Sequence, residues 1–208
     1  MARSARRTNA LRSICPTNSP PAIYTSAPTT ADVALRQGEV LSNLIQIHLA
    51  IDSVLSDEPL IDKKRHPLTI VVSQDCDLDW DFKARHGEAG AAQHKLVANI
   101  LFCEVQPLDE MRPALREAGI AGALWQRIPN NQDARFHALP AVPPEQDADG
   151  VGLPAMGVDF KRCFTIPTDE VYVRLVVEAR RRAVLDPVRA IDLSQRFAYF
   201  HSRVAIDF

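Results

Sequence analysis

The chain has 208 residues, 46% hydrophobic and 24% charged, which suffices to bury the core of one domain. A formal net charge of −2 excludes a strongly basic protein, so any polyanion would have to bind a local patch. No apolar run approaches the roughly 20 residues that cross a bilayer. The four cysteines are scattered without a C-x-x-C pair, which predicts reduced thiols, a cytoplasmic protein and no membrane contact.

Residues 1–31 are rich in Ser, Thr, Pro and Arg and contain no acidic residue. Such a composition buries too little apolar surface to offset the entropy lost on ordering, so we expect a disordered basic tail. The same composition is also typical of a transit peptide, and the residues leave that alternative open. Residues 32–208 are expected to form a single domain.

Apolar patterns predict the elements of this domain in chain order. Residues 40–51 suit either a strand or a helix, and the polar stretch 56–65 is expected to be a loop. Strands are predicted at five further places, 66–73, 96–105, 134–139, 158–166 and 180–185. Short helices are expected within 112–127 and after Thr168, which is a plausible N-cap. The long loops 84–95 and 140–157 are candidates to close over a site.

The end of the chain predicts an amphipathic helix. Asp186 suits an N-cap and Pro187 the first helical position. Apolar residues then recur at spacings of 3 and 4, at Ala190, Leu193, Phe197, Phe200 and Val204. We therefore predict an α+β fold, with a small, mainly antiparallel β-sheet or SH3-like barrel, short helices and this C-terminal helix packed on it.

Unusual chemistry follows the strand predicted at 66–73. If the chain stays extended past Gln74, Asp75, Asp77, Asp79 and Asp81 share one side, because strand side chains alternate. The simplest interpretation is a solvated acidic edge strand, with the intervening Cys, Leu and Trp side chains packed inward.

Catalysis is an alternative interpretation of the same residues. Asp75, Cys76 and Asp77 are candidate catalytic groups, although flanking carboxylates disfavour a thiolate. Arg135 and His137 share a face of the strand predicted at 134–139 and could bind phosphate or exchange protons. His137 is therefore a catalytic candidate, and the substrate-binding candidates are Ser73, Gln74 and Arg135.

Two of the carboxylates suggest a metal site. Asp77 and Asp79 could ligate Mg²⁺ or Mn²⁺, which prefer carboxylate oxygens. No other cofactor is expected.

The hexapeptide Ser73-Gln74-Asp75-Cys76-Asp77-Leu78 resembles an S-Q-x-C-D-L motif of uncharacterised bacterial proteins. In these it follows an R-Q-G-[DE]-[IV]-L segment, here 36–41, and precedes an Arg-aromatic-His strand, here 135–137. The resemblance implies a bacterial cytoplasmic protein from a stress or mobile-element locus and brings no established activity. The order of motifs is also similar to that of MazF/PemK-type toxins, small β-barrels that cleave single-stranded RNA. The matching strand 96–105 lacks their catalytic Thr or Ser, so only the barrel is implied.

Three functions stay open. The first is a ligand- or partner-binding module of a stress, toxin–antitoxin or phage-defence locus, with a protein of that locus as partner. The second is a metal-assisted hydrolase acting on RNA or a nucleotide through Asp75 and Asp77 with Arg135 and His137. The third is a thiol enzyme using Cys76. Proximity of Arg135 and His137 to residues 75–77 would favour the enzymes, and separation would favour the binding module.

Overall fold

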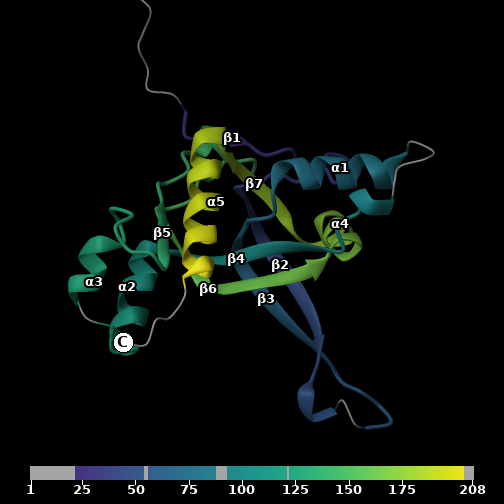
Figure 1. Ribbon diagram of the computed structural model, residues 1–208, viewed down its shortest axis with the longest axis horizontal. Helices are drawn as coiled ribbons and strands as arrows, with labels where there is room; N and C mark the ends of the chain where they lie inside the picture. Colours follow the sequence, from purple (N-terminus) through teal and green to yellow (C-terminus); the bar gives the residue numbers. More distant parts are fainter. Residues whose placement is uncertain (1–21, 54–55, 88–92, 121, 204–208) are drawn as a thin grey trace, which may run out of the picture.

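The computed structural model describes residues 22–53, 56–87, 93–120 and 122–203. Within them, seven strands form one antiparallel sheet in the order β1–β7–β2–β3–β4–β6–β5 (Figure 1). The strands are β1 (Tyr24–Ser26), β2 (Glu39–Leu49), β3 (Ile61–Val71), β4 (Asn99–Pro107), β5 (Phe136–Leu139), β6 (Met156–Pro167) and β7 (Arg180–Leu185). The sheet of the described residues is open, with β1 and β5 at its edges, rather than a closed barrel.

Helices cover both faces and one end of this sheet. They are α1 (Asp75–His86), α2 (Leu108–Glu117), α3 (Gly122–Arg127), α4 (Thr168–Val177) and α5 (Pro187–Ser202). Short 3₁₀ turns lie at Ile51–Ser53, Gln93–Lys95 and Pro144–Gln146. The predicted α+β class with a C-terminal helix is thereby confirmed. Among the helices that the structure describes, none has both the length and the apolar character needed to cross a bilayer.

Neighbouring residues of the central strands pack on opposite faces. Ile70 and Cys103 belong to a core cluster that includes Leu193 and Phe200 of α5. The next residue of β3, Val71, belongs instead to a second cluster beneath α1 and α4. Burial on both faces explains the continuous apolar sequence of the central strand, as predicted. Figure 1 shows α5 on one side of this arrangement and α1 with α4 at the other end.

The C-terminal helix begins as the sequence predicts. The Asp186 side chain accepts the backbone N–H groups of Val188 and Arg189, and Pro187 occupies the first turn. Val204, the last residue of the predicted stripe, lies outside the described residues. At α4 the prediction was wrong in detail. Thr168 is the first helical residue, and its hydroxyl donates to the carbonyl of Val97 instead of capping the helix.

The N-terminal tail predicted for residues 1–31 includes residues that belong to the folded domain. Tyr24 of β1 is buried, its strand pairs with β7, and its hydroxyl donates to the carbonyl of Pro140 at 3.0 Å. A three-residue strand anchored by one aromatic ring is too short for a periodic pattern to reveal. Residues 1–21, with their four arginines, lie outside the described part of the chain.

The loop at 140–157 is fastened to the sheet. Asp147 accepts the N–H of Gly152 at 2.8 Å and forms two short hydrogen bonds with Arg182 of β7. These bonds, led by that from the guanidinium, lower the pKa of Asp147 to about 2. The loop is therefore a pinned connection. Of the other predicted loop, 84–95, residues up to His86 are helical and residues 88–92 lie outside the described part.

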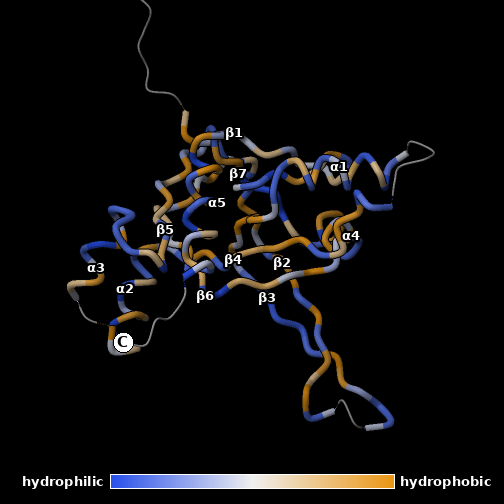
Figure 2. Tube along the Cα trace, viewed as in Figure 1, coloured by the Kyte–Doolittle hydropathy of each residue, from blue (hydrophilic) through white to orange (hydrophobic). Residues whose placement is uncertain are grey.

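Strands β2 and β3 run far beyond the rest of the sheet. β7 pairs with β2 only up to Ser42, and β4 pairs with β3 only from Thr69. Beyond Asn43, which has a φ of 58°, and the facing Pro67, the two strands continue together as a ribbon. We call residues 44–49 and 61–66, with the described residues between them, the arm. It projects from the body of the molecule in Figures 1 and 2. The predicted loop at 56–65 is thus partly strand.

Candidate functional site at the motif corner

The acidic run after β3 forms a helix, so the predicted extended strand at residues 75–81 is wrong. Gln74 is the N-cap residue of α1, and Gly87, with a φ of 146°, ends the helix. Acidic residues fill the first turn and basic residues the last, as the helix dipole favours. Lys83 pairs with Asp79 and Arg85 with Asp81, each four residues apart. These pairs four residues apart indicate a helix in the sequence, but the alternating aspartates suggested a strand instead.

Asp75 connects the start of α1 to the segment before β2. Its Oδ1 accepts the backbone N–H of Gln37 at 2.6 Å, and its Oδ2 lies 2.6 Å from Nη2 of Arg36. Partial burial raises the pKa of this carboxyl, but the bonds from Arg36 and Gln37 outweigh it and leave the pKa below its usual value. Asp75 is therefore an ionised residue that links the two segments, and both of its carboxylate oxygens are hydrogen-bonded to Arg36 or Gln37.

The segments 36–39 and 73–78, far apart in sequence, meet at one corner of the molecule, which we call the motif corner. Gln37 Nε2 donates to the carbonyl of Val72 at 2.9 Å, and the Ser73 hydroxyl accepts the N–H of Leu101 at 2.9 Å. Leu78, the last residue of the hexapeptide, is buried beneath α1. Most of the motif residues thus serve to join β2, β3, β4 and α1.

A buried ion pair lies on the inner side of this corner. Glu39 and Arg181 are both almost fully buried, with Nε of Arg181 2.5 Å from Oε1 of Glu39. Arg181 also donates to the backbone carbonyls of Thr30, Val33 and Ala34. A buried charge is tolerated only when it is paired and hydrogen-bonded in this way.

Cys76 is exposed on the first turn of α1. Its Sγ lies 3.8 Å from Oε1 of Gln74 and 3.8 Å from Oδ1 of Asp77. Within the described residues, no Lys, Arg or His is hydrogen-bonded to this sulfur. The structure therefore shows no base in position to deprotonate the thiol.

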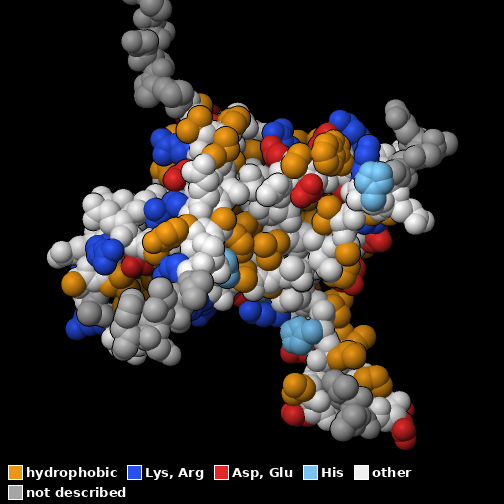
Figure 3. All heavy atoms as spheres, in the orientation of Figure 1, with side chains coloured by type: hydrophobic (Ala, Val, Ile, Leu, Met, Phe, Trp, Pro, Cys, Tyr) orange, Lys and Arg blue, Asp and Glu red, His pale blue; other side chains and the backbone are white. Residues whose placement is uncertain are grey.

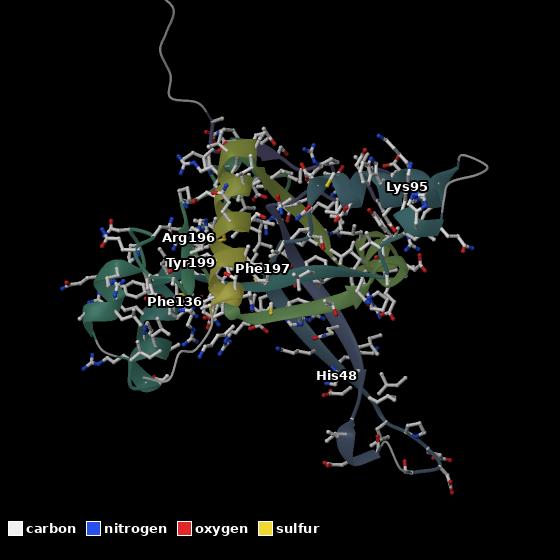
Figure 4. The ribbon with its side chains drawn as sticks, viewed as in Figure 1. His48, Lys95, Phe136, Arg196, Phe197 and Tyr199 are labelled. Carbon is white, nitrogen blue, oxygen red and sulfur yellow. The ribbon has the colours of Figure 1, made fainter. Side chains whose placement is uncertain are left out.

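The predicted metal ligands do not converge. Asp77 and Asp79 are two residues apart on a helix, so their side chains point about 200° apart around its axis. Asp79 pairs with Lys83 at 2.6 Å, whereas Asp77 borders a surface hollow of about 420 Å³ beside Trp80 and Lys95. Figure 4 shows Lys95 next to α1. On the helix these two carboxylates point in different directions, whereas on a strand they would have shared one side.

Arg135 and His137 lie away from the motif corner, because β4 and β6 separate β5 from β3. Arg135 forms two hydrogen bonds with Asp159, of 2.8 and 2.6 Å, just before β5. None of the hydrogen bonds of the described residues joins it or His137 to residues 75–77. In Figure 4, Phe136 lies beside α2 and α3 at the opposite end of the molecule from Lys95.

His137 is buried beneath α5 and faces Arg196, Asp192 and Arg189 of that helix. Burial, together with the nearby Arg196 guanidinium, lowers the pKa of His137 to about 4. The imidazole is therefore neutral near pH 7. A neutral, enclosed ring is a packing residue in this position, and it touches no group at the motif corner.

The sequence analysis missed the exposed apolar residues of the arm. Leu49 and Ile61 face each other across the ribbon with 52% and 66% of their surfaces exposed. Ile47 lies on the same face, two residues before Leu49. The signal was present as alternating apolar residues at Ile45, Ile47 and Leu49, but the polar stretch that follows them suggested a loop.

The fold and these sites define an α+β protein with an open antiparallel sheet, a tied motif corner and a projecting two-stranded arm. No protein-family model, curated protein or solved structure matches this chain.

Proposed function

We propose that this protein is a binding module whose partner is a protein, and that the arm is its binding element. The separation of Arg135 and His137 from residues 75–77 favours this function over the two enzymes. Two residues of the predicted enzyme sites bind within the chain, because the catalytic candidate Asp75 accepts hydrogen bonds from Arg36 and Gln37 and the substrate-binding candidate Arg135 donates to Asp159. The bacterial locus implied by the motif stays a prediction.

One observation carries the proposal, namely the exposed apolar face of the arm. The register pairs Ile45 with Arg65, Ile47 with Lys63 and Leu49 with Ile61, so these six side chains share one face. On it Ile45 is buried, whereas Ile47, Leu49 and Ile61 are exposed. The other face is polar, and there Nε2 of His48 lies 3.0 Å from Oδ2 of Asp62. Figure 3 shows hydrophobic side chains along the arm, and Figure 4 places His48 on it.

An isolated two-stranded ribbon is at best marginally stable in water. Covering its apolar face with another surface therefore stabilises the ribbon, since each Å² of apolar surface removed from water contributes roughly 25 cal/mol. A contiguous exposed apolar surface of this kind marks an interaction site more often than a free surface. A turn at Asn43 and Pro67 would suffice to connect β2 and β3 within the sheet. The arm is therefore longer than this connection requires.

The arm is held firmly at its root. The imidazole of His66 is fully buried, stacks on Phe164 with ring centroids 3.8 Å apart, and lies 3.1 Å from Oε1 of Glu104. Lys64 pairs with the same carboxylate at 2.6 Å, and Gln46 Nε2 donates to the carbonyl of Thr165 at 3.4 Å. These contacts fix the direction of the arm before a partner binds, so binding costs less conformational entropy.

The residues on the exposed face favour a protein over RNA as the partner. Single-stranded nucleic acids are bound by basic grooves with aromatic rings on which bases stack. The exposed face of the arm, Ile47, Leu49 and Ile61 with Lys63 and Arg65, contains no aromatic residue. Aliphatic side chains with two cations at the border suit an apolar protein surface with acidic residues nearby.

Site-specific photo-crosslinking tests the proposal. A benzophenone amino acid replaces Leu49 in the full chain in its native host, and in a matched strain it replaces Val151, which is 77% exposed but lies far from the arm in sequence. We expect ultraviolet light to yield defined protein adducts from position 49 and none from position 151. Equal adduct patterns from the two positions would refute a binding role for the arm.

A further inference from the structure

We infer that the arm binds a second copy of this chain, and that its apolar face docks on the exposed face of α4. The inference rests on the proposed function of the arm and names its partner. Two surfaces of the same molecule carry it. One is the arm face with Ile47, Leu49 and Ile61, and the other is an apolar stripe on α4.

The stripe on α4 consists of three valines that water covers. Val173, Val176 and Val177 are 58%, 75% and 71% exposed, whereas Val171 and Leu175 of the same helix are buried against the sheet. β-Branched residues are not favoured on an exposed helix surface, where they gain neither propensity nor packing. Contact with another molecule would remove these three neighbouring valines from water together.

The two surfaces match in length. The apolar stripe on α4 extends from Val173 to Val177, which is about 6 Å at the helical rise of 1.5 Å per residue. The exposed apolar face of the arm extends from Ile47 to Leu49, which is about 7 Å at the strand rise. Each surface can therefore cover the other over its full length.

Charge decides between the arm and α4 as the docking surface on the second copy. If two arms met face to face, Lys63 and Arg65 of one copy would lie against the same residues of the other, and like charges repel. The α4 stripe instead follows Asp169 and Glu170. They pair with Arg85 and, at 3.9 Å, with Arg174 of the same copy, but their side chains stay 82% and 45% exposed. Lys63 makes no ion pair within the described residues, so it is free to meet them.

Each copy carries both surfaces, so two copies related by a twofold axis make the contact twice. Such a pair uses both arms and both α4 stripes and leaves no docking surface open. We therefore expect assembly to stop at the dimer. In Figure 1 the arm extends well beyond the body, which lets it reach α4 of a neighbouring molecule.

Sedimentation and light scattering of the full chain test this inference. We expect a dimer for the wild type, and at least about a tenfold rise in the dimer Kd for Ile61→Glu on the arm and for Val176→Glu on α4, because each buries an unpaired charge. Val188→Glu, on an equally exposed valine of α5, is the matched control and should stay dimeric. Thermal unfolding verifies that all three variants are folded.

Mixing the two interface variants gives the sharper result. A pair of one Ile61→Glu copy and one Val176→Glu copy retains one intact arm–α4 contact, so the mixture should associate more strongly than either variant alone. The double variant Lys63→Glu with Glu170→Lys, which exchanges the two charges, should recover association that Lys63→Glu alone loses.

A monomeric wild type, a dimer that Val176→Glu does not weaken, or a mixture no stronger than its components would each overturn the inference. The crosslinking experiment separates this failure from failure of the proposed function. An adduct between position 49 and a different protein would leave the binding module intact and remove the second copy as its partner. An absence of specific adducts would remove both.

Discussion

Oδ1 of Asp75 accepts the backbone N–H of Gln37 at 2.6 Å, so one carboxylate joins two segments of the motif that lie 38 residues apart. The same carboxylate pairs with Arg36, but both side chains are about half exposed and solvent screens that pair. The bond to the backbone is therefore the larger contribution. The aspartate at this position of the hexapeptide therefore has a structural explanation.

Replacement of Asp75 should weaken folding more than replacement of its neighbour. We expect Asp75→Ala to lower the free energy of unfolding by about 1–2 kcal/mol, because it leaves the Gln37 N–H and Arg36 without their partner. Cys76→Ala removes an exposed side chain and should change it by less than about 0.5 kcal/mol. Urea unfolding of the two variants gives both values, and equal effects would contradict this role of Asp75.

The buried pair of Glu39 and Arg181 should show strong coupling. We expect Arg181→Met or Glu39→Leu to destabilise the protein by about 3–5 kcal/mol, since each leaves an uncompensated buried group. The double variant Glu39→Leu, Arg181→Met should be more stable than the sum of the single losses predicts. A double-mutant cycle from chemical unfolding measures this, and additive losses would argue against a direct pair.

His137 should make the protein sensitive to acid. Its pKa is about 4 in the folded protein and about 6.5 when unfolded, so the unfolded chain takes up the proton first as pH falls. The stabilisation is complete above pH 6.5 and is lost between pH 6.5 and pH 4, by about 3 kcal/mol. In His137→Leu this part of the acid-dependent loss should disappear. Unfolding free energies at pH 7 and pH 4.5 compare the two proteins, and parallel pH profiles would show that the imidazole does not cause the loss.

Thiol labelling should separate the described cysteines by burial. Cys76 is exposed, whereas burial, with smaller contributions from Cys163 and nearby carboxylates, raises the pKa of the enclosed Cys103 thiol. In a Cys15→Ser background, we expect rapid labelling of Cys76 at the rate of free cysteine and labelling of Cys103 only on unfolding. A Cys76 labelling rate far above that of free cysteine would support the hypothesis of a thiol enzyme.

Much of the fold could be predicted because local patterns and burial agree there. Continuous apolar runs located the central strands, and Asp186 with Pro187 located the start of α5. The acidic run misled the prediction because D-x-D-x-D fits alternation in a strand as well as it fits a helix with acid–base pairs four residues apart. Only the partners Lys83 and Arg85 distinguish the two, and these follow the run rather than lie within it.

The candidate site was less predictable than the fold. Ser73, Asp75 and Leu78 were recognised as unusual, but their roles depend on Leu101, Gln37 and the core beneath α1, which no local pattern reveals. Arg135 and His137 were correctly placed on or beside one strand. Their distance from the motif corner follows from the order of strands in the sheet, and sequence alone does not fix that order.

Arg181 donates hydrogen bonds to the carbonyls of Thr30, Val33 and Ala34. These bonds limit how far the chain can be shortened at its N-terminal side. Deletion up to residue 34 would strip three acceptors from an enclosed guanidinium and leave Glu39 as its main remaining counterpart. The segment ahead of the first long strand thus stabilises the folded body, and deleting it would weaken the motif corner at its buried ion pair.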